Sequence, residues 1–248
     1  MADYYPRLAR WLGPIVRGYS RLQVIGREHL PDAGQPVILA CNHPGSLWWD
    51  ALCLAAALPQ REIRFVAQHW DAKSRVLVAM LSRVGALFQV LDMEQIDEQD
   101  AVVQALRQGE TICVYPEQSY HSFWRRYTLF RFAPHALRYA ELGQAVIVPT
   151  AIIGAEEAAP TLLGWKARGM PLHFPLHPPL VLPRKITVEF SPSRTCAQLT
   201  SEPGGSEMQP ADYLRGADRL RNLVSDVIRR YRHCRTSDSC YLDHRGWW

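Results

Sequence analysis

The 248-residue chain lacks several features that would assign it to a class of protein at once. No apolar run approaches the ~20 residues that a membrane-spanning helix needs, and Met1 to Tyr5 do not begin a signal peptide. The formal net charge is only +4, so the total charge gives no indication of nucleic-acid binding. The six cysteines show no C-x-x-C pair, which favours reduced thiols in a cytosolic compartment and predicts neither a metal site nor disulfides.

Apolar residues make up 48% of the chain. They gather in segments that alternate between strand-like and helix-like patterns. Strands are expected at 22–25, 37–41, 64–67, 86–91, 111–115, 145–152 and 185–190, and helices at 48–58, 74–84, 97–108, 134–142 and 211–232. This alternation predicts an α/β fold with a largely parallel central sheet flanked by helices. Two stretches interrupt it. Residues 164–183 hold five prolines and are expected to form a packed loop, and residues 191–210 are expected to form a mobile connection.

Residues 4–20 have the pattern of an amphipathic helix at the N-terminus. Apolar side chains recur at helical spacing among basic ones, namely Leu8, Trp11, Leu12, Ile15 and Val16 with Arg7, Arg10 and Arg17. Such a helix can lie on an anionic membrane surface or pack on the protein core with its arginines in solvent. The pattern leaves both interpretations open.

The segment 42–50 is the candidate catalytic segment. It directly follows the expected strand 37–41 and contains His43 and Asp50. A neutral imidazole can take a proton from an alcohol, and a carboxylate on its other ring nitrogen would orient it. This pair therefore suits acyl transfer to a hydroxyl. A second polar group, Glu117, follows the strand 111–115, and we expect it to bind an acceptor hydroxyl, to orient a backbone turn, or only to cap a strand end.

Four blocks of the sequence, in this order, resemble the phospholipid/glycerol acyltransferase family, of the lysophosphatidate acyltransferase type. Asn42-His43 with Asp50 is similar to the first block of the family, and residues 115–120 (YPEQSY) are similar to its F-P-E-G-T-R block. Residues 126–132 (RYTLFRF) and 146–152 (VIVPTAI) are similar to the segments that follow. A bacterial branch with a longer His-to-Asp interval looks closer than the others.

This resemblance implies a glycerolipid acyltransferase-like enzyme at residues 21–192, preceded by the helix 1–20 and followed by a loop, helix and tail at 193–248. The donor would be acyl-CoA or acyl-carrier protein, used as a co-substrate with no other cofactor and no metal, and the acceptor a lysophospholipid or related lipid alcohol. His43 would be the general base and Asp50 would orient it. The substrate would contact Asn42, Ser46, Glu117, Ser119, Arg126 and Arg131. The implied location is cytoplasmic, on the inner face of the membrane, with no nucleic-acid partner.

The sequence departs from the family pattern in two places. Six residues separate His43 from Asp50 where four are usual, so we expect the two side chains to meet only if a turn absorbs the extra length. Tyr120 and Leu91 stand where the family carries arginines for the acceptor phosphate. Either Arg126 or Arg131 replaces them, or the acceptor carries no terminal phosphate. A non-catalytic lipid-binding protein, and a hydrolase or transacylase independent of CoA, are the alternative functions.

Overall fold

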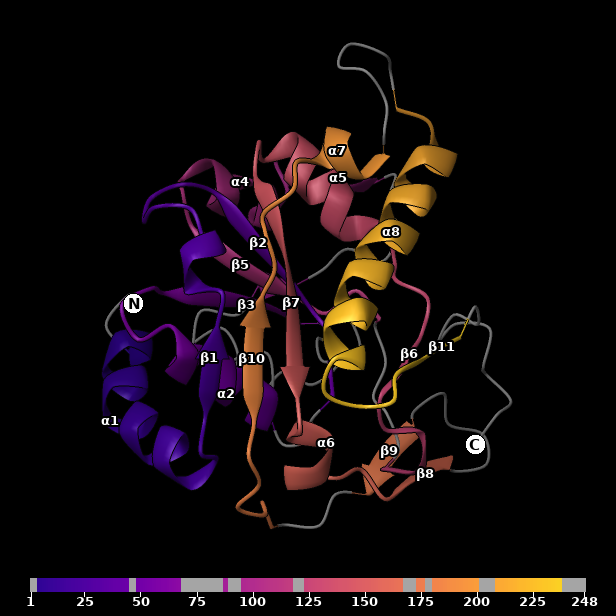
Figure 1. The fold of residues 1–248 in the computed structure, drawn as a ribbon. Coiled ribbons are helices and arrows are strands. Elements are labelled where there is room, and N and C mark those ends of the chain that lie inside the picture. The colour runs from indigo at the N-terminus through magenta and orange to yellow at the C-terminus, as the bar shows by residue number, and fades with distance from the viewer. Residues whose placement is uncertain are drawn as a thin grey trace.

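A central sheet of seven strands organises the protein (Figure 1). The computed structural model describes residues 4–44, 48–67, 87–88, 95–117, 123–166, 173–176, 180–200 and 208–237. Across the sheet the strands run in the order β1 (Gln23–Ile25), β10 (Thr187–Phe190), β7 (Val146–Ile153), β2 (Val37–Cys41), β5 (Thr111–Val114), β3 (Ile63–Ala67) and β4 (Leu87–Phe88). All neighbours are parallel except β10 and β7. The predicted, largely parallel α/β sheet is confirmed.

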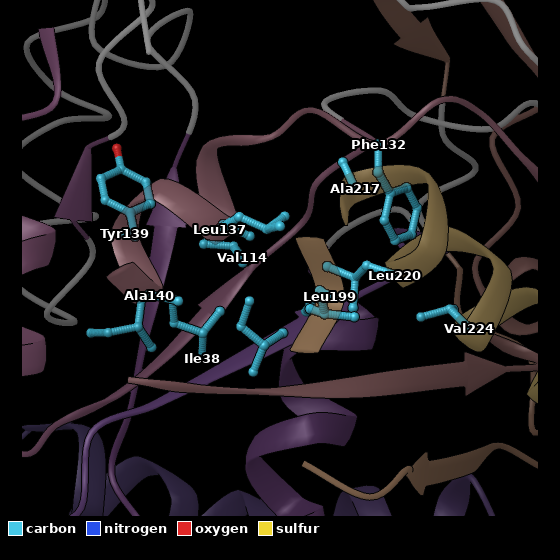
Figure 2. Packing of buried hydrophobic residues seen from close by; sticks show 14 of the residues in the cluster. Ile38, Val114, Phe132, Leu137, Tyr139, Ala140, Leu199, Ala217, Leu220 and Val224 are labelled. Atoms are coloured by element: carbon cyan, nitrogen blue, oxygen red, sulfur yellow. The ribbon is translucent and has the colours of Figure 1, made fainter. Parts of the chain in front are cut away.

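Helices cover both faces of the sheet because its central strands are apolar on both sides. In β2, Ile38 and Ala40 face one hydrophobic cluster, whereas Val37, Leu39 and Cys41 face the other. The first cluster is closed by α4 (Ala101–Arg107), α5 (His135–Leu142), α7 (Cys196–Thr200) and α8 (Pro210–Arg229). Figure 2 shows its packing. The second is closed by α1 (Tyr4–Tyr19), α2 (Trp49–Ala57) and the short α6 (Ala155–Ala158).

The N-terminal helix α1 packs on the protein with one face only. Val16 is buried in the second cluster and Leu12 is partly buried against it, and the Arg17 Nε donates to the Ala56 carbonyl at 2.7 Å. On the other face Trp11 is 78% exposed and Ile15 is 65% exposed. The helix is therefore docked on the core and still presents an apolar surface. Among the described residues, no helix is long and apolar enough to cross a bilayer.

Two of the expected irregular segments contain regular structure instead. β8 (Leu163–Lys166) and β9 (His173–Leu176) form an antiparallel ribbon within the stretch 164–183 that we expected to be a loop. A two-stranded ribbon tolerates Pro175 because an edge strand does not need every backbone N–H. The expected mobile connection 191–210 contains α7, whose Leu199 is buried, and Arg194 pairs with Ile147 of β7.

Most of the other expected elements are present, with ends that differ from the expected ones by at most four residues. Further short elements of the described residues were not expected, namely η1 (Arg27–His29), η4 (Phe123–Arg125), β6 (Thr128–Leu129), α6 and β11 (Arg235–Thr236). The expected helix 74–84 lies outside the described residues, as does most of the expected strand 86–91, of which only β4 is described. The division into segments 1–20, 21–192 and 193–248 stays a prediction.

Candidate active site

The candidate site lies at the carboxyl end of β2, between its parallel neighbours β5 and β7. The next strand after β2 in the sequence, β3, lies in the sheet on the β5 side of β2. The strand β7 pairs with the other side of β2. In open α/β sheets a crevice forms where successive connections diverge in this way, outside the carboxyl ends of the strands. His43 follows β2 by two residues and therefore lies at such a point.

His43 and Asp50 are in contact, as the chemistry of the segment required. The His43 Nδ1 and the Asp50 Oδ2 are 2.6 Å apart, and the Asp50 side chain is 0% exposed. Asp50 lies in the first turn of α2, where the helix dipole favours a carboxylate, and its Oδ1 accepts from the Ala51 N–H at 2.8 Å. Trp48, at the N-cap of α2, has a φ of 59°, a strained backbone for a large residue. The longer interval thus still brings the two side chains together.

The ring of Tyr115 packs against the ring of His43. The two ring centroids are 4.3 Å apart and the planes meet at 34°. Tyr115 follows β5, so the neighbouring strand supports the imidazole on the side that Asp50 does not hold. Burial raises the pKa of the Tyr115 hydroxyl well above its ordinary value, and the charge of Asp50 raises it further. Tyr115 was not among the predicted site residues, although its place directly before Pro116-Glu117 was a usable signal.

Glu117 connects three segments of the site through its buried carboxylate. One oxygen accepts from the backbone N–H of His43 at 3.2 Å, and the other accepts from the backbone N–H of Phe130 at 2.9 Å. Of the tasks expected for Glu117, the orientation of a backbone turn is the one that the structure shows. Contact with an acceptor hydroxyl stays a prediction.

Asn42 bonds to protein rather than facing a crevice. Its amide nitrogen donates to the Ile152 carbonyl at 2.9 Å, and its amide oxygen accepts from the Ile152 N–H at 2.8 Å. The side chain is 2% exposed. The amide thus continues the pairing of β2 with β7 by one residue, and contact of Asn42 with substrate stays a prediction. The amide positions the backbone that carries His43.

Three buried cysteines surround the base of the site and behave as small apolar residues. The Sγ atoms of Cys41 and Cys113 are 3.7 Å apart across β2 and β5, and the Cys53 Sγ lies 3.8 Å from the Ser20 Oγ. Burial raises the pKa of the Cys53 thiol to about 12 and that of the Cys113 thiol well above its ordinary value, with Asp50 adding to both. Protonated thiols are poor nucleophiles, so Cys53 and Cys113 are structural.

The two arginines proposed for an acceptor phosphate bond to other groups. The guanidinium of Arg126 lies 4.6 Å above the ring of Phe123 and donates to the Phe123 carbonyl at 3.2 Å. The Arg131 Nε lies 3.9 Å from an oxygen of Asp218 on α8. Neither of these contacts involves His43 or Asp50, and phosphate binding by either arginine stays a prediction. The remaining two predicted residues, Ser46 and Ser119, lie outside the described residues.

Comparison with known proteins shows the family of this chain. A family model described as Acyltransferase matches residues 21–153, so the chain belongs to the Acyltransferase family. It is 33% identical to an uncharacterized protein of Mycobacterium leprae over 176 residues, which are 65% of this chain and 45% of that protein. It is 31% identical to an uncharacterized protein of Mycobacterium tuberculosis over 237 residues, which are 86% of this chain and 62% of that protein. The chain thus spans about half to three-fifths of the length of these relatives.

A solved structure has a similar fold at lower identity. The crystal structure of the 1-acyl-sn-glycerophosphate (LPA) acyltransferase PlsC from Thermotoga maritima matches with a TM-score of 0.54 and 15% identity. The match covers 93% of this chain and 81% of that one. This likeness shows the shared fold, and the site residues of this chain are assigned from its own geometry.

Proposed function

We propose that the protein transfers a fatty acyl chain from a thioester donor to the hydroxyl of a glycerolipid acceptor, with His43 as the general base. The observation that carries this proposal is the 2.6 Å contact between His43 and the fully buried Asp50 at the carboxyl end of the central strand. Membership of the Acyltransferase family supports the reaction class.

The reaction follows from the bonds that His43 already makes. Its Nδ1–H donates to Asp50, so Nε2 is the nitrogen that takes the proton of the acceptor hydroxyl. The hydroxyl oxygen then attacks the thioester carbonyl carbon and forms a tetrahedral oxyanion. Collapse of this intermediate breaks the C–S bond, forms the ester and releases a thiolate, which takes the proton back from the imidazolium. No covalent acyl-enzyme is required, because a thioester is already an activated acyl donor.

The groups around His43 would keep its ring in place through this cycle. Asp50 stabilises the imidazolium that forms, Tyr115 packs against the ring, and Glu117 binds the backbone N–H of His43. A general base in a fixed position contributes about 10²- to 10⁴-fold to the rate of such a step.

The acceptor and donor classes are part of the proposal. The printed title of the PlsC structure names a 1-acyl-sn-glycerophosphate acyltransferase, and for this chain we extend the acceptor class to lysophospholipids and related lipid alcohols. The donor is acyl-CoA or acyl-carrier protein, used as co-substrate. Neither nucleic acid nor a further cofactor has a part in this chemistry.

A lipid acceptor requires the enzyme to meet a membrane surface, and α1 offers a suitable face. Trp11, Ile15 and Tyr19 are spaced by four residues and form one exposed stripe along the helix. The Tyr19 hydroxyl donates to the Val181 carbonyl, beside the exposed Leu180. We place this surface on the cytoplasmic face of the membrane. The double variant W11A/I15A should sediment with anionic vesicles at least tenfold more weakly than the wild type, since each side chain contributes ~1.5 kcal/mol or more. Equal sedimentation would refute the docking role of α1.

The decisive experiment offers labelled acyl-CoA and acyl-carrier protein to the purified protein with a panel of lysophospholipids and neutral lipid alcohols. Acylated lipid supports the proposal and identifies the acceptor. Free fatty acid as the sole product would replace it with a hydrolase, and no turnover of any donor would replace it with a lipid-binding protein.

A further inference from the structure

A surface pocket of about 500 Å³ opens where α8 ends. It is lined by Arg229, Arg230, Tyr231, Arg232, His233 and Cys234. The volume lies in the range of small-molecule sites. Its lining combines guanidinium groups with a tyrosine and a histidine ring, the side chains that bind phosphates and stack on planar bases.

The three arginines of this pocket are oriented by carboxylates and remain about half-exposed. Arg229 pairs with Asp226 at 3.0 Å, Arg232 pairs with Glu157 at 3.4 Å, and Arg230 pairs with Glu189 of β10. A guanidinium has five N–H donors, and one ion pair uses at most two of them. The arginines are therefore held in place and can still donate hydrogen bonds to an anion.

The pocket continues into a two-stranded ribbon, because β11 directly follows the lining residue Cys234. β11 lies beside β6 (Figure 1) and pairs with it in parallel. The Arg235 N–H donates to the Tyr127 carbonyl at 2.9 Å. Arg126 precedes Tyr127, and the guanidinium of Arg232 lies 5.9 Å from the Tyr127 ring centroid. The three lining arginines are each ion-paired, and the N–H donors that these pairs leave over favour a ligand that accepts several hydrogen bonds, such as a phosphate.

This pocket is linked to His43 through a short series of contacts. Ser237, which follows β11, donates its N–H to the Leu129 carbonyl of β6 at 2.8 Å. The next residue of that segment, Phe130, donates its N–H to Glu117, which also accepts from the N–H of His43.

We propose that this pocket binds the phosphates of a CoA-type donor, the charged nucleotide end of the thioester that would react at His43. In such a donor a pantetheine arm separates the thioester from the phosphates, so a phosphate site apart from His43 is what the reaction needs. The 3′-phosphate and the diphosphate supply charges for the arginines, and adenine supplies a planar face for Tyr231 or His233. The inference rests on the proposed function and names its donor.

The test measures binding of CoA itself, without any reaction. Calorimetric titrations at low salt would compare CoA, 3′-dephospho-CoA and pantetheine on the wild type and on the variant R229A/R232A. The matched control is R215A, which removes another exposed arginine of α8 with an aspartate partner three residues before it. We expect 3′-dephospho-CoA to bind about tenfold more weakly than CoA and pantetheine weaker still. R229A/R232A should weaken CoA binding at least tenfold, with R215A unchanged.

The possible results of this experiment test the phosphate pocket and the proposed acyl transfer separately. Equal CoA affinity in R229A/R232A and the wild type overturns the pocket, as does turnover with acyl-carrier protein and none with acyl-CoA. If R229A/R232A loses its binding to anionic vesicles but keeps its affinity for CoA, the arginines bind lipid headgroups. That result would refute the inference as well. If the phosphate-dependent loss is found while no acyl transfer occurs, the pocket stands and the proposed function fails.

Discussion

Replacing Asp50 with asparagine should remove the base without disturbing the fold, because the structure dictates how the new amide must lie. The Asp50 Oδ1 accepts from the Ala51 N–H at 2.8 Å, so the asparagine oxygen keeps that place and its NH₂ group faces the His43 Nδ1. An NH₂ group donates to Nδ1 and places the ring proton on Nε2, the atom that must be free of a proton to act as base.

The size of the effect can be worked from the same bonds. A hydrogen bond to a charged group contributes ~1.5–3 kcal/mol, which is about 10- to 100-fold in rate if only ring orientation is lost. Loss of the productive tautomer adds to this, and the same substitution in the His–Asp pair of serine proteases lowers kcat by about 10⁴-fold. We therefore expect kcat to fall between about 10²- and 10⁴-fold in D50N, with KM changed little.

The assay is steady-state acyl transfer from labelled acyl-CoA, combined with urea unfolding of each variant. Both hydrogen bonds of residue 50 survive the substitution, so the free energy of unfolding should change by about 1 kcal/mol or less. The matched control is D100N, which replaces the carboxylate at the N-cap of α4 that accepts from the Val102 N–H. A folded D50N enzyme with more than a tenth of the wild-type kcat would refute the reasoning.

Three further substitutions and one chemical probe test the surroundings of the pair. E117Q should lower kcat by about tenfold or more and destabilise the fold by ~1–3 kcal/mol, since an amide NH₂ then faces a backbone N–H; unchanged kcat would remove its positioning role. N42A should lower the free energy of unfolding by ~2–4 kcal/mol in urea, because two buried backbone groups lose their partners; a loss below 0.5 kcal/mol (roughly the noise of such work) would contradict this. G154A should destabilise by ~1 kcal/mol or more, as its φ is 94° and a Cβ would lie 2.4 Å from the Lys185 carbonyl oxygen; equal stability would refute the strain. Cys53, with its pKa raised to about 12 by burial, should resist a thiol reagent at pH 8 until urea unfolds the protein, and rapid native labelling would show that the site opens.

The sequence predicted the central strand and the His–Asp pair well, for a physical reason. An uninterrupted apolar run of the length of 37–41 is typical of a strand buried on both faces, and polar residues directly after a parallel strand lie at the edge where crevices form. The contact between His43 and Asp50 depended on a turn whose conformation the spacing did not determine. The structure closes it with Trp48 in the left-handed region.

The sequence could not show which groups Asn42, Arg126 and Arg131 contact in the folded protein. Asn42 was grouped with the substrate contacts, yet its partner Ile152 is 110 residues away on β7. Arg126 and Arg131 were correctly identified as a local excess of cations, but Phe123 and Asp218 decide where they point. The sequence shows which charged residues are present, but it does not show which groups they contact.

The prolines of residues 164–183 led to the prediction of a loop where the structure has two paired strands. Proline is rare inside sheets because it lacks a donor, and that rule favoured a loop. β8 and β9 pair only with each other, so Pro175 needs no second partner strand. The same local pattern therefore fits a loop and an isolated ribbon.

The central claim is that His43 takes the proton from the acceptor hydroxyl, and the most direct test is acyl transfer by H43A. Labelled acyl-CoA and the acceptor identified by the panel would be incubated with wild-type and H43A protein of equal folded content. The account predicts a loss of at least 10²-fold, roughly the contribution of a positioned general base. Retention of more than a few per cent of the wild-type rate by folded H43A (an order-of-magnitude limit) would contradict it.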